Sequence, residues 1–256
     1  MQITVRYWVV VGIGFVVVAL AFFGWSYRAQ APSPAITASS TENSTPIATT
    51  TVVVGPFPIN SADTIASWSF KGAYAGNETL IAQANADITH LTGLIGKGEY
   101  DDYDLYLGIG NDKGLLGDGK SAYDNYNRAI RIHPQKGLAF VNLGHLFDQF
   151  GAYRTAADAY AKATAVEPGV LEYHIQRLNY LTRQFPNDSA RIASALTAVY
   201  KVFGDTAQIL SIKAQWLTEL KRYTDAISAW ETVKMLSPGK DTTAIDAEIA
   251  RLQAKQ

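Results

Sequence analysis

Apolar residues recur every three or four positions from about residue 77 to the C-terminus, the spacing that places them on one face of an α-helix. One run predicts a helix that begins after Asn77 and ends before Gly96, with apolar positions Ile81, Ala84, Ile88, Leu91 and Ile95. Another predicts a last helix that Asp241 can cap, with Ile245, Ile249 and Leu252 on its apolar face. The pattern therefore indicates an all-α fold. We further expect the short aromatic stretch Trp68, Phe70 and Tyr74 to pack on the first of these helices.

The helical pattern repeats itself at an interval of 34 residues. Six identical pairs share this register: Gly110 and Gly144, Gly117 and Gly151, Ala122 and Ala156, Tyr126 and Tyr160, Ala129 and Ala163, Pro134 and Pro168. Each unit reads as a helix, a tight turn at a glycine and a second helix that ends before a proline. One such hairpin cannot bury its own apolar faces, so the hairpins must stack on one another.

The 34-residue pattern resembles the tetratricopeptide repeat (TPR). Residues 137 to 170 carry it best, with Phe140, Leu143, Gly144, Phe147, Gly151, Tyr153, Ala156, Tyr160, Ala163 and Pro168 in the family's places. Residues 103 to 136 match next best, although Lys113 stands where the family prefers an aromatic residue. Residues 171 to 206 match poorly: this unit keeps Ala190, has Leu178 where a small residue is expected, and is two residues longer than the other units. Residues 207 to 240 regain the pattern with Ala214, Tyr223, Ala226, Trp230 and Pro238. The resemblance implies an α-solenoid, to which helices at about 77 to 96 and 241 to 254 would form the terminal caps.

The N-terminal quarter of the chain has a different composition. Residues 7 to 27 contain no charge and are mostly apolar, a length sufficient to cross a membrane as one helix, with tyrosine and tryptophan at both ends. A cleaved signal peptide is the alternative, since Ala29-Gln30-Ala31 has the form of a cleavage site, but the apolar run is long for one. Residues 29 to 56 contain 14 Ser, Thr or Pro in 28 positions, which indicates a disordered linker. We therefore expect a transmembrane anchor at 1 to 28, this linker at 29 to 56 and a repeat domain at 57 to 256. Since neutral linkers of this kind are commoner outside the cytoplasm, the domain is expected to be extracytoplasmic on a single-pass cell-membrane protein.

The stretch GLLGDGKS, from Gly114 to Ser121, matches the phosphate-loop pattern of nucleotide-binding proteins. A phosphate loop follows a buried strand, whereas here Gly114 belongs to a repeat helix and Gly117 to its turn. The repeat therefore accounts for the motif, and Lys120 and Ser121 remain the residues of a weaker, nucleotide-binding alternative. The chain has no cysteine, and its histidines lack the spacing of metal ligands, so the sequence predicts no cofactor and no metal site. A net charge of −1, with the basic residues dispersed, gives no indication of nucleic acid as a partner.

The TPR resemblance implies a concave groove lined by the first helix of each hairpin. The residue after each small helix position then points inward, and polar residues follow one turn later. The candidate partner-binding residues are Asn111, His145, Asp148, Gln149, Asn179, Arg183 and Gln215. The positions one turn earlier are apolar or neutral, so the basic clamp of chaperone-binding members is absent, and a partner with an apolar or mixed surface is expected.

The sequence thus favours a non-catalytic, membrane-anchored scaffold that binds a protein or peptide partner, with a role in cell-envelope assembly or secretion. The alternatives are an enzyme, nucleotide-dependent or hydrolytic, and an architectural protein that associates with itself.

Overall fold

A computed structural model describes residues 55–256, which belong to one compact unit. The predicted anchor at 1 to 28 and almost all of the predicted linker at 29 to 56 lie outside the described residues. Within the described part of the chain, none of the helices is both long enough and apolar enough to span a bilayer.

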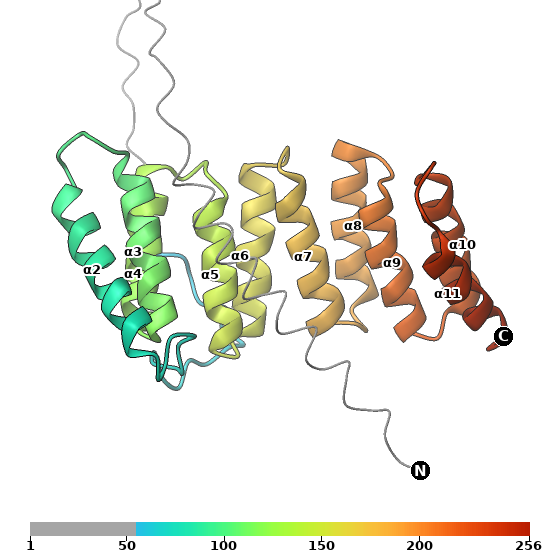
Figure 1. The fold of residues 1–256 in the computed structure, drawn as a ribbon, viewed down its shortest axis with the longest axis horizontal. Coiled ribbons are helices and arrows are strands. Elements are labelled where there is room, and N and C mark those ends of the chain that lie inside the picture. Colours follow the sequence, from blue (N-terminus) through green and yellow to red (C-terminus); the bar gives the residue numbers. More distant parts are fainter. Residues whose placement is uncertain (1–54) are drawn as a thin grey trace, which may run out of the picture. The chain divides into compact units, whose positions relative to one another are not determined.

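The regular structure of residues 55–256 is helical, apart from one isolated β-bridge between Ser69 and Asp118 (Figure 1). It comprises ten helices: α2 (Glu78–Leu94), α3 (Asp102–Leu116), α4 (Gly119–Ile132), α5 (Leu138–Gln149), α6 (Tyr153–Val166), α7 (Leu171–Gln184), α8 (Ser189–Phe203), α9 (Ala207–Glu219), α10 (Tyr223–Met235) and α11 (Thr243–Gln253). Helices α3 to α10 form four consecutive hairpins, in each of which the two helices pack on one another. This tetratricopeptide-like, all-helical arrangement agrees with the one that the 34-residue interval predicts.

Local chemistry explains where the helices begin. The side chain of Asn77 accepts a hydrogen bond from the Leu80 amide, and the α2 helix starts at the next residue after Asn77. Asp101 and Asp118 cap α3 and α4 in the same way. At α11 the geometric cap is Thr242 rather than the predicted Asp241. Asp241 nevertheless accepts from the Thr243 backbone N–H at 2.9 Å, so its carboxylate satisfies the first amide of the helix.

The turns inside the first, second and fourth hairpins each contain one residue with a left-handed backbone. Gly117 and Gly151 take φ values of 85° and 71° at equivalent places in the first two hairpins. The fourth hairpin has Lys221 at this place with φ of 59°, a conformation that costs a residue with a side chain about 1–2 kcal/mol. Glycine at the first two turns is therefore explained by conformation, as the sequence predicts.

Small residues set the spacing of the first two hairpins. A Cβ atom on Gly110 would lie 2.5 Å from the ring of Tyr126, and one on Gly144 would lie 2.7 Å from the ring of Tyr160. The tyrosine of the second helix thus fills a notch that the glycine of the first helix leaves open. This contact lets each helix pair approach closely.

The third hairpin departs from this packing, and one prediction for it is wrong. Ala190 was expected to keep the small position, but it is exposed near the start of α8, and Ile192 is fully buried at that place instead. The reason is that α7 runs one residue further than α5 does in this register, and the turn that follows it is one residue longer, which together shift the register of α8 by two. With Leu178 and Ile192 in place of small residues, both buried, this hairpin has no glycine notch.

The first helices of the hairpins define the inner face of the array. Helix α3 contacts α5 and α7 contacts α9, whereas no two of the second helices among the described hairpins are in comparably close contact. First helices that lie closer together than second helices give a stack curved toward the first helices. The inner face is therefore the surface of α3, α5, α7 and α9, and the outer face that of α4, α6, α8 and α10.

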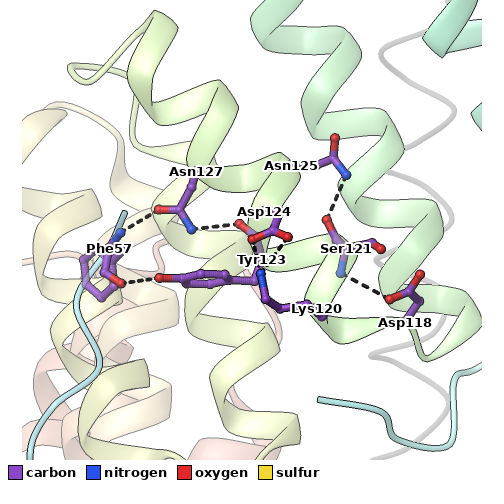
Figure 2. Close-up of polar contacts among 8 residues, drawn as sticks. All are labelled: Phe57, Asp118, Lys120, Ser121, Tyr123, Asp124, Asn125 and Asn127. Carbon is purple, nitrogen blue, oxygen red and sulfur yellow. Dashed lines mark hydrogen bonds and ion pairs between the residues drawn. The ribbon is translucent and has the colours of Figure 1, made fainter. Parts of the chain in front are cut away.

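An extended segment, residues 57–75, lies against α4, α5 and α6, and we call it the N-terminal strap. Phe57 donates its backbone N–H to Asn127 Oδ1 at 2.6 Å and accepts from the Tyr123 hydroxyl at 2.8 Å (Figure 2). The expectation that its aromatic residues pack on the first helix is wrong for two of them. Trp68 and Phe70 pack instead on the ring of Phe150, at the turn between α5 and α6.

Candidate functional site

The stretch from Gly114 to Ser121 does not have the geometry of a phosphate loop. Gly114 lies in the last turn of α3, and Gly117 is the cap residue that ends this helix. The Asp118 carboxylate accepts a hydrogen bond from the Ser121 amide at 3.2 Å, so an anion of the protein already occupies the start of α4 (Figure 2). Lys120 forms an ion pair with Asp124 at 2.5 Å, one turn further along α4. The repeat accounts for each residue of the motif.

The seven candidate residues lie on the four first helices, which form the inner face. Helix α3 carries Asn111; α5 carries His145, Asp148 and Gln149; α7 carries Asn179 and Arg183; and α9 carries Gln215. Six are exposed or nearly so, and Asp148 is half-buried.

Two of these residues are held by the tyrosines that fill the glycine notches. The Tyr126 hydroxyl donates to Asn111 Oδ1 at 2.9 Å. The Tyr160 hydroxyl lies 2.9 Å from His145 Nδ1. In both hairpins the tyrosine of the second helix therefore reaches past the glycine and fixes the polar residue that follows it on the inner face. The third hairpin cannot do this, because Leu196 stands in the place of the tyrosine.

Side chains on neighbouring first helices are joined across the inner face. Asn142 of α5 donates to Asn111 of α3 at 3.0 Å, and His145 Nε2 lies 3.1 Å from Gln176 Oε1 of α7. Farther along the same helices, Arg183 donates to Asp148 at 2.6 Å. These bonds form a polar ladder that links the first three hairpins, which we define by Asn111, Asn142, His145, Asp148, Gln176 and Arg183.

Three of the predicted residues are outside this ladder. The side chains of Gln149, Asn179 and Gln215 are exposed and make no polar contact with the described protein. Each can donate and accept hydrogen bonds through its amide. The inner face thus combines ordered polar groups on α3 and α5 with free amides on α5, α7 and α9.

The environment of the ladder shifts the pKa of its histidine. Desolvation by the surrounding protein lowers the pKa of His145, although the hydrogen bond to Gln176 and the charge of Asp148 act in the opposite direction. Part of the His145 residue remains exposed, so desolvation concerns the ring nitrogens, which lie between Tyr160 and Gln176. Neutral imidazole suits this position, because one ring nitrogen accepts from the tyrosine while the other donates to the glutamine oxygen.

The other histidines have structural partners or lie apart. His133 lies 2.9 Å from Asp101, and His174 is buried with its Nε2 atom 3.0 Å from the Pro168 carbonyl. Among residues 55–256 there is no cluster of three or more His, Cys, Asp or Glu side chains placed to hold a metal ion.

Sequence reasoning missed the polar partners that organise the inner face. Asn142 and Gln176 are on neighbouring helices, and only the stacking of hairpins brings them to Asn111 and His145. It also missed the strap residue Asp63, which accepts from both the backbone N–H and the hydroxyl of buried Thr155, at 2.6 and 2.7 Å. This extended segment has no periodic pattern of apolar residues from which its position could have been predicted.

Comparison with known proteins finds relatives that resemble only part of the chain. No family model matches it. The cytochrome c-type biogenesis protein CcmH of Escherichia coli is 29% identical over 128 residues, and CcmH of Shigella flexneri is equally similar. The alignment covers 50% of this chain and 37% of each relative, so the chain matches well under half the length of these proteins. A solved structure, that of a thermophilic TPR protein from Thermus thermophilus, is 14% identical over 69% of this chain and 94% of that chain, with a TM-score of 0.44. The repeat architecture therefore rests on the helix hairpins of this chain.

Proposed function

We propose that the protein is a non-catalytic scaffold that binds a protein or peptide partner on the inner face of its helical array. The observation that carries this proposal is that the inner face presents two kinds of polar side chain, some hydrogen-bonded within the protein and others without a partner in the described protein. The ladder orders Asn111, His145 and Asp148, while Gln149, Asn179 and Gln215 are left exposed without a partner in the described protein. Amide side chains presented by a rigid helical surface suit hydrogen bonding to a partner backbone.

Asn179 is the best position for a test, because it is exposed at the centre of this face and has no tyrosine to hold it. A photo-crosslinking amino acid at position 179 of the full chain, in bacterial membranes, should give a discrete adduct. The matched control carries the same amino acid at Ser194, which is exposed on α8 of the outer face. An adduct at 179 that is absent at 194 supports the inner face. Adducts at both positions, or none at 179, contradict it, and an adduct of twice the chain mass identifies self-association instead.

We also propose that residues 7 to 27 hold the chain in a cell membrane, with the repeat domain on the extracytoplasmic side. The uncharged length of this stretch supports the anchor. The similarity to CcmH, a cytochrome c-type biogenesis protein, favours a role in the assembly of envelope proteins. In such a protein the anchor would raise the local concentration of binding sites at the membrane surface.

Membrane fractionation tests this second proposal. The full chain should remain in the membrane pellet after carbonate extraction, and a chain without residues 7 to 27 should not. A protease added outside intact spheroplasts should cleave the repeat domain of the full chain. Release of the full chain by carbonate would contradict the anchor. Protection of its repeat domain from the protease would contradict the proposed orientation.

A further inference from the structure

A pocket of about 150 Å³ opens on the outer face between α6, α7 and α8. Its wall consists of Ala157, Asp158, Ala161, Arg177, Leu181 and Arg191. It thus combines two guanidinium groups with short apolar side chains, one hairpin further along the array from the strap.

Arg177 is the unusual member of this wall. Its Nη1 atom donates to Thr164 Oγ1 at 3.2 Å, but its Nε atom is buried and meets no acceptor among the described residues. Desolvation, together with the charge of Arg191, lowers the pKa of Arg177. A guanidinium that is partly withdrawn from water and lies near a second cation is costly unless an anion joins it.

Arg191 adds a second positive group at the edge of the pocket. Its Nε atom lies 3.3 Å from Asp188, the cap residue of α8, and its guanidinium lies 5.1 Å from the ring centre of Phe185. These contacts hold the side chain at the start of α8. The other N–H groups of the guanidinium remain able to bind a carboxylate, for which the planar fork is suited.

The next groove of the outer face already holds an extended chain. There the strap lies between α4 and α6, with the Asp63 carboxylate bound to Thr155 and the Asn60 amide bound to Asp158 at 2.8 Å. Asp158 also belongs to the wall of the pocket, so the two grooves share helix α6. The outer face of this array therefore accepts an extended segment that carries an acidic side chain, and it does so within the molecule itself.

We propose that the pocket binds an acidic side chain of an extended segment from a partner protein, with its carboxylate between Arg177 and Arg191. The volume suits one side chain and not a folded element. Ala157 and Ala161 leave the floor open, and Leu181 contacts the apolar part of the side chain. Asp158 in the wall and Asp188 beside Arg191 balance the two positive charges, so the attraction for a carboxylate comes from the guanidinium of Arg177, whose Nε atom has no acceptor among the described residues. This surface is separate from the inner face, and either proposal can fail while the other stands.

Binding of a synthetic probe to the full chain in detergent tests the proposal. The probe is a fluorescent nine-residue peptide of Ala, Ser and Asp with blocked ends, and its matched control carries Asn in place of each Asp. We expect the acidic peptide to bind and the Asn peptide not to, as measured by fluorescence anisotropy at low salt. Arg177→Met and Arg191→Gln should each weaken binding by about tenfold. Arg131→Gln removes an equal charge from an exposed site on α4 and should leave binding unchanged.

Thermal stability separates a binding role for Arg177 from a structural one. Thr164 keeps its own bond to the Ala161 carbonyl when the arginine is removed, so Arg177→Met should not lower the melting temperature. Ala161→Leu, which fills the pocket without a change in charge, should also abolish binding of the acidic peptide. Equal binding of both peptides, or equal binding to the wild type and the Arg177 and Arg191 variants, would overturn the proposal. Absence of binding at millimolar peptide would do so as well.

Discussion

The glycine notch makes a quantitative prediction about stability. In Gly144→Ala the new methyl would lie 2.7 to 2.8 Å from three ring atoms of Tyr160, a side chain that is only 2% exposed and whose hydroxyl is engaged by His145. Overpacking of this kind costs about 1–3 kcal/mol. Replacement of a helical glycine by alanine by itself raises the free energy of unfolding by about 0.8–1 kcal/mol. The net expectation is a loss of ~0–2 kcal/mol, which corresponds to a fall of up to about 8 °C in melting temperature for a domain of this size.

Gly93→Ala is the matched control, since a Cβ atom on this glycine of α2 meets nothing within 4 Å. The same substitution should therefore stabilise the protein here, by about 0.5–1 kcal/mol. Urea denaturation followed by circular dichroism measures both variants, and the double variant Gly144→Ala/Tyr160→Leu should recover part of the loss. The third hairpin tolerates Leu178 opposite Leu196 in a similar way. If Gly144→Ala is as stabilising as Gly93→Ala, the tyrosine does not fill the notch and the reasoning fails.

Three further predictions concern pH, the strap and the phosphate-loop motif. The lowered pKa of His145 means that the folded chain binds this proton less readily than the unfolded chain, so stability is full above about pH 6.5 and falls as the pH drops below it. The urea midpoint should thus decrease more between pH 7.5 and 5.5 for the wild type than for His145→Gln, and equal decreases would contradict this. Asp63→Ala leaves the N–H and hydroxyl of buried Thr155 with less than their full set of partners, so a loss of about 1–3 kcal/mol and faster tryptic cleavage after Lys71 are expected; an unchanged cleavage rate would show that the strap does not depend on this bond. Lys120→Ala breaks an exposed ion pair and two long cation–π contacts with Trp68 and Tyr123, and should change stability by less than about 1 kcal/mol. Isothermal titration with magnesium ATP should show no saturable binding to either form, and a binding curve lost in Lys120→Ala would refute the structural interpretation of this motif.

The candidate site could be predicted in outline but not in its organisation. The register of the repeat identifies the helices on which Asn111, His145 and Asn179 lie, because a 34-residue interval repeats the same helix face. It does not reveal that the first two are bound by tyrosines whereas Asn179 is free. That difference depends on the side chain opposite each notch.

The third hairpin shows where local pattern fails. A constant interval places Ala190 in the small position, yet one extra residue at the end of α7 and one in the following turn shift the register, and Ile192 is buried there instead. Only the burial of α8 decides between these registers, since both leave an amphipathic helix.

The sequence by itself determined the helical hairpins, the cap of α2 and the glycine turns, because these depend on residues within a few positions of one another. The tertiary structure alone decided the polar ladder, the path of the strap and the pocket around Arg177. Each of these joins residues from different hairpins, or from an extended segment with no periodic signal, such as Asp63 and Thr155 at 92 positions apart. Contacts of this kind arise from the stacking of hairpins, and local sequence carries no record of which side chains the stacking will bring together.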